Sequence, residues 1–421
     1  MLPFTRCLFA VLALFGAASA HAADFFFKDG DVVVMIGDSI TEQHQYSNFV
    51  EMWTVTRFPK WKLTFRNVGI GGDRSTGGNS RFARDVLIHK PTAMTVDFGM
   101  NDGNYAAFQE GTFNTYVGGL QGMADQAKAA NIRVAWATPQ PLDNGDQGPT
   151  ALTGYNQTLE KYSAGVKMIA EKNGGMFVDQ FHPYLAVLDS ARSKGPNYSR
   201  ITGGDAVHPG PPGQSLMAAS ILKGLSFPPL VSSAELNATS GKVVDAKNCT
   251  VEILSAKDGG LSFSRRDGAL PFFPTDAVSI LQWTPILEEL NDYRLKVTGL
   301  AAGKYEVRAG GKKIAELTSD RLAEGVNLAS AALGGGPIAE QVQAVRTAVE
   351  NKNRYHHDSI FRGMVLFGTP DWIYSIVPRE EFEAKKQAII SERHAHLAAM
   401  DALVAKACEM KANTFDIVPM K

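Results

Sequence analysis

The sequence predicts an α/β fold in which helices cover both faces of a parallel sheet. The first observation is a set of short, continuous apolar runs such as 32–36, which suit strands that are buried on both faces. The second is that longer segments with helical spacing alternate with these runs. Strand–helix alternation requires crossover connections, so the strands should be parallel, and ligands should bind beyond their carboxyl ends.

This alternation extends from residue 31 to about residue 227. Further strand-like runs lie at 94–98, 132–136 and 176–178, and helical spacing marks 111–130, 151–172 and 212–224. The Phe227-Pro228-Pro229 segment interrupts both patterns, so we place the end of the α/β domain (31–227) there.

The remainder of the chain predicts two further regions. Residues 230–330 read as short strands, with a hairpin whose two-residue turn is Gly310-Gly311, and they predict a smaller β-sandwich-like domain. Glycines at 334–336 separate it from a helical C-terminal region, 337–421. Within that region, the Ala, Lys, Glu and Leu content of 378–411 favours one long helix.

The amino terminus has the composition of a signal peptide. Arg6 precedes a short apolar run, and Ala20-His21-Ala22 is a small-x-small cleavage site, so we expect residues 1–22 to be removed and the protein to be secreted or periplasmic. The run is too short for a membrane span. Cys249 and Cys408 could pair in an exported protein, but they fall in different predicted regions, which favours unpaired thiols.

Charge excludes one broad class of partner. Lys and Arg number 42 and Asp and Glu 43, a net charge of −1, which argues against a nucleic-acid binder. We expect no cofactor and no metal: the adjacent His356 and His357 would diverge on a helix or strand, and a solvated polar segment is the simpler interpretation.

Two blocks of possible catalytic residues follow early strand-like runs or precede helices. In Gly37-Asp38-Ser39-Ile40, Ser39 would begin a helix directly after a strand, where a nucleophile or a simple N-cap would both fit. The block 67–73, Asn-Val-Gly-Ile-Gly-Gly-Asp, would let the backbone approach a ligand. It fails the dinucleotide fingerprint because Arg74 occupies the last glycine position.

Two later blocks supply an amide and an imidazole. Asn101 follows the strand-like run 94–98, where its amide could donate to a developing oxyanion or simply form a turn. In Asp205-Ala206-Val207-His208, the carboxylate could reach Nδ1 of the imidazole and leave Nε2 free as a base. His182 follows Asp179 at the same spacing, and we choose His208 because its block ends the α/β region and precedes the last helix.

Together, the four blocks resemble the SGNH (GDSL-type) hydrolase family over residues 31–227, with Ile40 where the family name has leucine. The resemblance implies a flavodoxin-like, three-layer α/β fold. It implies that Ser39 is the nucleophile, that His208 is the general base and acid, and that Asp205 orients the imidazole.

The resemblance also implies an oxyanion hole made by the backbone N–H groups of Ser39 and Gly72 and the side chain of Asn101. Gly71 is the alternative to Gly72. Asp38 and Arg74 are weaker candidates for substrate contact, and for Arg74 a surface salt bridge is an equal alternative.

We therefore expect a secreted serine esterase that hydrolyses O-acyl, above all O-acetyl, esters of carbohydrate. Its substrate would be a small-molecule or polysaccharide ester, and an appended β-rich region is compatible with an enzyme that acts on polysaccharides. The alternatives are a lipase, lysophospholipase or thioesterase of the same fold, or a non-catalytic glycan-binding protein. The sequence leaves the sugar, the regiochemistry and the oligomeric state open.

Overall fold

The computed structural model describes residues 24–144, 154–194 and 200–420, so the predicted signal peptide lies outside the described residues. The amino-terminal region contains a five-stranded parallel sheet in the order β2-β1-β3-β4-β5. Its strands are β1 (Val32–Gly37), β2 (Thr64–Asn67), β3 (Ala93–Asp97), β4 (Arg133–Ala137) and β5 (Met176–Val178). This is a flavodoxin-like strand order, and it confirms the predicted α/β class.

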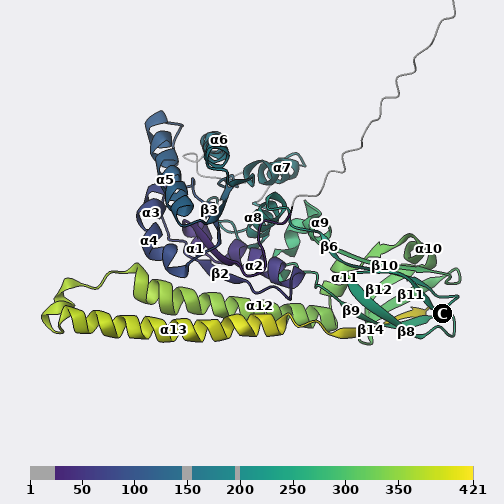
Figure 1. Ribbon diagram of the computed structural model, residues 1–421. Helices are drawn as coiled ribbons and strands as arrows, with labels where there is room; N and C mark the ends of the chain where they lie inside the picture. Colours follow the sequence, from purple (N-terminus) through teal and green to yellow (C-terminus); the bar gives the residue numbers. More distant parts are fainter. Residues whose placement is uncertain (1–23, 145–153, 195–199, 421) are drawn as a thin grey trace, which may run out of the picture.

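Helices cover both faces of this sheet (Figure 1). They are α1 (Ser39–Glu42), α2 (Gln45–Arg57), α3 (Ser75–Ser80), α4 (Phe82–Asp85), η1 (Leu87–His89), α5 (Glu110–Ala129), α6 (Tyr155–Asn173), α7 (Phe181–Arg192) and α8 (Pro211–Gly224). Successive side chains of β1 point to opposite faces: Val33 and Met35 pack in the core that contains α2 and α8, whereas Val34 and Ile36 pack in the core with α5 and α6. Both faces are therefore buried, which explains the continuous apolar run.

The β-rich region consists of two sheets, in the orders β13-β10-β6-β7 and β12-β11-β14-β9-β8. Its elements are β6 (Leu230–Asn237), β7 (Lys242–Lys247), β8 (Cys249–Ser255), β9 (Leu261–Asp267), η3 (Thr275–Gln282), α9 (Ile286–Leu290), β10 (Asp292–Thr298), β11 (Lys304–Ala309), β12 (Lys312–Thr318), α10 (Ser319–Glu324), β13 (Val326–Asn327) and α11 (Ala329–Leu333). The predicted hairpin is β11–β12, and Gly310 and Gly311 supply the positive φ angles, 57° and 79°, of its turn.

The C-terminal region is a long helical hairpin that returns to the β-rich region. It consists of α12 (Pro337–Tyr355), η4 (His356–Leu366), η5 (Asp371–Ser375) and α13 (Arg379–Ala407), and strand β14 (Ala412–Pro419) then pairs between β11 and β9. The range predicted as helical thus ends in a strand. Along α13, the buried Ile390, Leu397 and Val404 lie seven residues apart, and they form an apolar seam along the paired helices.

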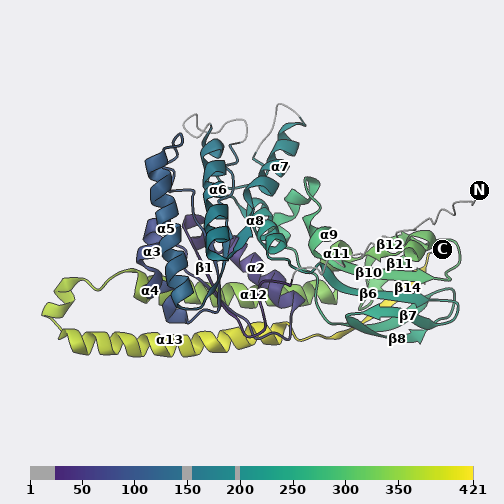
Figure 2. The same cartoon turned by 45° about the horizontal axis from the view of Figure 1, so that its top comes forward.

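Charged side chains fix the hairpin against the α/β region, which it passes in Figures 1 and 2. Lys352 of α12 forms a buried ion pair with Glu51 of α2, and Asn353 Nδ2 donates to the second Glu51 oxygen at 2.7 Å. Arg66 of β2 pairs with Asp401 of α13 at 2.6 Å. Separating a buried ion pair is costly, so the Lys352–Glu51 pair holds α12 against α2. The Arg66–Asp401 pair holds α13 against the edge strand β2.

The return of the chain to the β-rich region brings the two cysteines to the same cavity. Cys249 and Cys408 are both free, as we expected, yet both line one cavity of about 670 Å³ next to the β-rich region. Among the described residues, no helix is at once long enough and apolar enough to cross a bilayer.

Candidate active site

The predicted site residues gather at the carboxyl edge of the parallel sheet. Ser39 is the first residue of α1, directly after β1, while Gly72 and Asn101 follow β2 and β3. Asp38 is the N-cap of α1, and its Oδ1 accepts a hydrogen bond from the Ile40 backbone at 2.9 Å. This cap fixes the start of the helix, so Ser39 has a defined position at the sheet edge.

His208 and Asp205 come from the loop before α8 and meet Ser39. Ser39 Oγ lies 2.9 Å from His208 Nε2, and His208 Nδ1 lies 3.1 Å from Asp205 Oδ2. Burial alone would raise the pKa of Asp205. Hydrogen bonds from the backbone N–H groups of His208 and Val207, together with the imidazole, outweigh it and lower this pKa below its ordinary value. The carboxylate is therefore charged at neutral pH and oriented toward the imidazole.

The second Asp–x–x–His segment forms the same local pair at a different place. His182 Nδ1 lies 2.7 Å from Asp179 Oδ2, but its Nε2 faces Glu160 Oε1 at 3.7 Å rather than a hydroxyl. Its side chain is 55% exposed on α7. The spacing thus produces the pair twice, and only the fold places one of the two imidazoles against Ser39.

The Asn101 amide is held by hydrogen bonds on both of its ends. Nδ2 donates to Asp38 Oδ2 at 3.2 Å and to the Asp73 backbone oxygen at 3.1 Å, while Oδ1 accepts from the Tyr105 hydroxyl at 2.8 Å. The partners on each end agree with the chemistry of that end, so they fix which way the amide faces. The sequence analysis missed Tyr105, whose only signal was its position in the loop after Asn101.

Tyr105 belongs to a turn with an uncommon backbone. Asn104 and Tyr105 both have positive φ angles, 56° and 55°. Arg74 Nη2 donates to Asn104 Oδ1 at 2.7 Å. The exposed Arg74, which we had considered for substrate contact or a salt bridge, therefore supports the turn that carries Tyr105.

The glycine loop presents Gly72, rather than Gly71, to open space. Gly72 has φ 73°, and an added Cβ would meet no atom within 4 Å. A Cβ on Gly71 would lie 2.9 Å from Glu42 Oε2, so that residue is packed against the end of α1. This difference favours Gly72 as the residue whose backbone borders the site.

Three buried carboxyl groups underlie the site. Asp38 is 3% exposed and both of its oxygens accept hydrogen bonds within the protein, so our assignment of Asp38 to substrate contact is revised: it supports α1 and Asn101 from beneath. Burial, followed by repulsion from Asp97, raises the pKa of Asp38. Burial also raises the pKa of Asp97 to about 7 and that of Asp102 to about 6.

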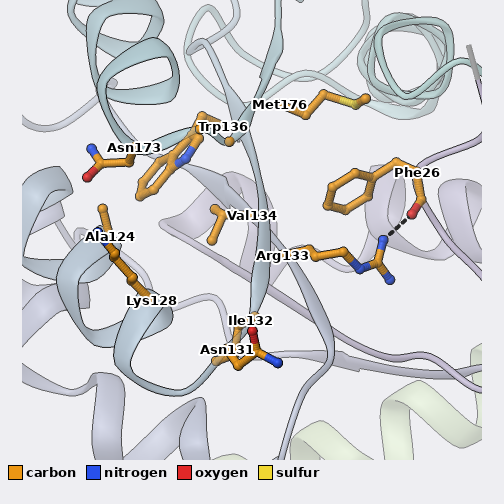
Figure 3. Close-up of a pocket in the computed structure, with 12 residues that line it drawn as sticks. Phe26, Ala124, Lys128, Asn131, Ile132, Arg133, Val134, Trp136, Asn173 and Met176 are labelled. Carbon is orange, nitrogen blue, oxygen red and sulfur yellow. Dashed lines mark hydrogen bonds between the residues drawn. The ribbon is translucent and has the colours of Figure 1, made fainter.

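Another cavity, of about 500 Å³, lies at the opposite edge of the sheet (Figure 3). Its lining residues include Ile132, Arg133 and Met176, at the amino ends of β4 and β5, and Arg133 donates to the backbone oxygen of Phe26. It contains none of the predicted site residues. Reaction chemistry belongs at the carboxyl edge instead.

Within the described parts of the chain, no group of three His, Cys, Asp or Glu side chains is placed to hold a metal ion. The expectation of a solvated segment at His356 and His357 is wrong: His356 is 1% exposed, with its ring parallel to that of Phe361, and the His357 side chain is 15% exposed. Helix α12 continues into η4 and packs this segment against the α/β region.

A serine, an imidazole and a carboxylate thus lie in line at the carboxyl edge of the sheet. Residues 35–216 match the model of the GDSL-like lipase/acylhydrolase family. The α/β domain is therefore an SGNH (GDSL-type) hydrolase domain, which confirms the predicted resemblance, and the protein is an ester hydrolase.

Individual relatives cover different shares of the chain. The acetylxylan esterase of Geobacillus stearothermophilus is 23% identical over 219 residues, 47% of this chain and 95% of that protein. A solved structure of that enzyme, Axe2, covers 48% of this chain and 96% of its own, with 22% identity and a TM-score of 0.40. The structure of BT4096, a gut microbial diltiazem-metabolizing enzyme, is 24% identical, covers 94% of this chain and 98% of its own, and has a TM-score of 0.79. The structural similarity to BT4096 therefore extends beyond the α/β domain, over the β-rich region and the hairpin.

Proposed function

We propose that the protein is an exported serine esterase that removes O-acetyl groups from carbohydrate. The observation that carries the proposal is the 2.9 Å contact between Ser39 Oγ and His208 Nε2, with Asp205 behind the imidazole. A serine hydroxyl is a poor nucleophile at neutral pH, and a base at this distance is the usual means of activating it.

In the proposed mechanism, Ser39 Oγ attacks the ester carbonyl carbon while His208 Nε2 accepts the hydroxyl proton. The carbonyl oxygen becomes an oxyanion, which the backbone N–H groups of Ser39 and Gly72 stabilise. The Asn101 amide joins them by exchanging one of its two hydrogen bonds, to Asp38 or to the Asp73 backbone oxygen, for the oxyanion. The bond to the sugar oxygen then breaks, and His208 returns the proton to that oxygen. Water next attacks the acetyl-enzyme and gives a proton to His208. The bond between the acyl carbon and Ser39 Oγ then breaks, His208 returns the proton to Oγ, and acetic acid leaves and ionises to acetate.

Two observations support a carbohydrate ester as the substrate. The acetylxylan esterase that resembles this chain acts, by its name, on an acetylated polysaccharide. In addition, His208 is 35% exposed and Asp205 63% exposed, so the site opens to solvent and can admit a hydrophilic chain.

Two measurements test this proposal. A fluorophosphonate probe should label the wild-type protein and fail to label Ser39→Ala, while circular dichroism shows that the variant is folded. Absence of labelling in the wild type would indicate a binding protein instead. Acetate release from a panel of acetylated glycans should exceed hydrolysis of p-nitrophenyl esters of long acyl chains, and the opposite preference would favour a lipase.

Export is a separate part of the proposal. It rests on the composition of residues 1–22. Mass spectrometry of the protein recovered from the periplasm or medium should give a mature chain that begins at Ala23. A protein that remains in the cytosol with its first residues intact would contradict export without affecting the proposed reaction.

A further inference from the structure

A cavity of about 470 Å³ lies beside Tyr105, between two segments that follow neighbouring strands of the parallel sheet. One wall is the connection from β3 to α5, which contributes residues 105–108, and the other is the start of α6, between residues 154 and 161. In a parallel α/β sheet, the helix after each strand begins at the carboxyl edge, so both walls belong to the edge that carries Ser39. The volume is typical of small-molecule sites, which span roughly 300–1,000 Å³.

The two walls of the cavity are fixed to each other. Thr158 Oγ1, on α6, donates to the Ala106 backbone oxygen at 2.9 Å. The rings of Tyr105 and Tyr155 lie 5.3 Å apart, and the Tyr155 hydroxyl donates to the Met100 backbone oxygen at 2.7 Å. These contacts join the segment after β3 to α6, so the cavity has a defined shape.

Tyr105 stands between this cavity and the candidate active site. Its hydroxyl donates to Asn101 Oδ1 at 2.8 Å, while the residue lines the cavity. Burial, followed by the charges of Asp38 and Asp205, raises the pKa of Tyr105 to about 12, so the phenol is neutral. Because charges act strongly only at short range, Tyr105 also lies near the catalytic carboxylate. A group bound in the cavity is therefore one aromatic ring away from the proposed oxyanion hole.

Hydrogen bonds also connect the start of α6 to the loop that carries His208. Asn156 holds the backbone of Leu142, accepting from its N–H at 2.7 Å and donating to its oxygen at 3.1 Å. The next residue, Asp143, donates from its backbone N–H to the Ala206 oxygen at 3.2 Å. Ala206 is two residues before His208, so the cavity wall has a fixed position relative to the triad.

The side chains that a ligand in the cavity can reach suit a sugar. Gln157 and Lys161 are exposed and lie four residues apart on α6, so they share one face of the helix. Lys161 Nζ is 4.3 Å from the centroid of the Phe108 ring, which holds the ammonium at the rim. An amide donates and accepts, an ammonium donates, and the Tyr105 ring offers apolar area. A pyranose, with hydroxyls around its rim and C–H groups on its faces, matches this combination.

We infer that this cavity binds a sugar unit of the carbohydrate chain that neighbours the unit whose acetyl ester faces Ser39. The inference rests on the proposed function, because it assumes a carbohydrate substrate. The hydroxyls of the bound unit pair with Gln157 and Lys161, and its C–H face packs against the Tyr105 ring. The Tyr105 hydroxyl keeps its bond to Asn101, so Tyr105→Phe would leave the subsite intact.

The test compares O-acetylated xylotetraose with O-acetylated xylose, which is too short to occupy both positions. Gln157→Leu replaces the amide with an apolar group of similar size, and Lys161→Met keeps an unbranched apolar stem over Phe108 and removes the ammonium. Each variant loses one hydrogen bond to the neighbouring unit. Therefore kcat/KM on the tetraose should fall about fivefold more than on xylose, mainly through KM. Both residues are exposed, so the variants should fold like the wild type.

A third variant fills the cavity instead of removing its polar groups. Ala107 is exposed and lines the cavity, so the indole of Ala107→Trp would occupy the space of the sugar. This variant should raise KM for the tetraose more than Gln157→Leu or Lys161→Met does, and it should leave KM for xylose unchanged.

The matched control is Lys128→Met. Lys128 is an exposed lysine on α5 that lines the cavity of about 500 Å³ at the opposite edge of the sheet. It should keep the wild-type ratio between the two sugars. Equal losses on both sugars in the Gln157 and Lys161 variants, or an unchanged ratio in them, would overturn the subsite. A change of the ratio in Lys128→Met as large as in Lys161→Met would overturn it as well.

The wild-type protein separates this inference from the proposed function. If it cleaves p-nitrophenyl acetate but neither acetylated sugar, the carbohydrate substrate is wrong, and the subsite falls with it. If it deacetylates both sugars while the three cavity variants keep the wild-type ratio, the proposed function stands and the subsite alone is overturned.

Discussion

The hydroxyl of Tyr105 donates a hydrogen bond to Asn101 Oδ1 across 2.8 Å. The other end of the same amide donates to Asp38 and to the Asp73 backbone. Tyr105 therefore prevents the amide from turning over, and it keeps Nδ2 on the side where the oxyanion hole is proposed. An oxyanion-hole donor is effective only when it points at the developing charge before the reaction begins.

We predict that Tyr105→Phe lowers kcat about tenfold with little change in KM. The amide would remain present but less well oriented, so the loss should be smaller than the roughly 10²–10³-fold cost of removing an oxyanion donor altogether. Steady-state kinetics on an acetyl ester measures both constants. An increase in KM at constant kcat would instead indicate that Tyr105 binds the substrate.

Tyr155→Phe is the control for Tyr105→Phe. The Tyr155 hydroxyl donates to the Met100 backbone oxygen at 2.7 Å, and its ring lies 5.3 Å from that of Tyr105, a ring contact that phenylalanine keeps. Removal of the hydroxyl should lower stability by about 1 kcal/mol, the typical net value of a hydrogen bond, with a smaller effect on kcat. Equal losses of kcat in both variants would argue against a specific role for Tyr105.

The two Asp–His pairs give a second prediction. His208→Ala should lower kcat by at least about 10³-fold, because it removes the only imidazole next to Ser39 Oγ in the described structure. His182→Ala should stay within about twofold of the wild type, because its imidazole faces Glu160 on the surface. Kinetics of both variants on the same acetyl ester provides the comparison, and the reverse order would transfer the base to residue 182.

The strand pattern predicted the parts of the site that directly follow strands. Ser39 and Asn101 each follow a buried strand, and parallel strands bring their carboxyl ends to one edge, so their neighbourhood follows from the strand pattern. The choice between His182 and His208 was harder, since both have an aspartate three residues earlier. Which of them reaches Ser39 depends on the path of the loop before α8, and spacing contains no information on that path.

The elements that were missed are those whose packing overrides their local pattern. Helix α2 is buried almost all around, with Trp53, Thr54 and Thr56 fully covered, so it lacks the polar face that marks a helix in a sequence. Strand β14 follows a long helix and completes a sheet whose other strands lie far back in the chain. The Tyr105 contact was missed for a different reason: it is local, four residues from Asn101, but it depends on the positive φ angles of Asn104 and Tyr105.

Gly37 gives a prediction about the backbone beneath Ser39. A Cβ at this position would clash with the Thr41 hydroxyl and would lie 2.6 Å from the Asp97 backbone oxygen, which belongs to the neighbouring strand. Gly37→Ala should therefore lower the free energy of unfolding by about 1–3 kcal/mol, the usual cost of overpacking, and reduce kcat by displacing Ser39. Urea unfolding and kinetics measure the two effects.

Gly118→Ala is the matched control for Gly37→Ala. Gly118 lies within α5, and an added Cβ there would meet no atom within 4 Å. Since alanine favours the helix over glycine, this variant should be more stable by about 0.5–1 kcal/mol and fully active. If both variants were equally destabilised, the space around the added methyl group would not be the cause.

The buried Asp97 predicts how stability depends on pH. Burial raises its pKa from 3.8 to about 7, against the opposing hydrogen bond from Gln180 Nε2 at 2.9 Å. Between about pH 4 and pH 7, the folded protein therefore holds a proton at Asp97 that the unfolded chain has released. Because folding takes up this proton, the contribution of Asp97 to the free energy of unfolding should decrease as the pH rises through this interval, with a slope of up to about 1.4 kcal/mol per pH unit.

Asp97→Asn tests this pH dependence, since the amide keeps the shape of the side chain and cannot titrate. Urea unfolding at a series of pH values from about 4 to about 7.5 should give a free energy of unfolding that falls less, or rises more, with pH for the variant than for the wild type. The buried His44, His89 and His356, whose pKa values burial lowers, contribute the opposite slope in both proteins. The variant keeps the same kind of contribution from Asp102, whose pKa burial raises to about 6, and from Asp38, whose pKa burial also raises. Parallel profiles for the two proteins would show that Asp97 is ionised in the folded state throughout this range.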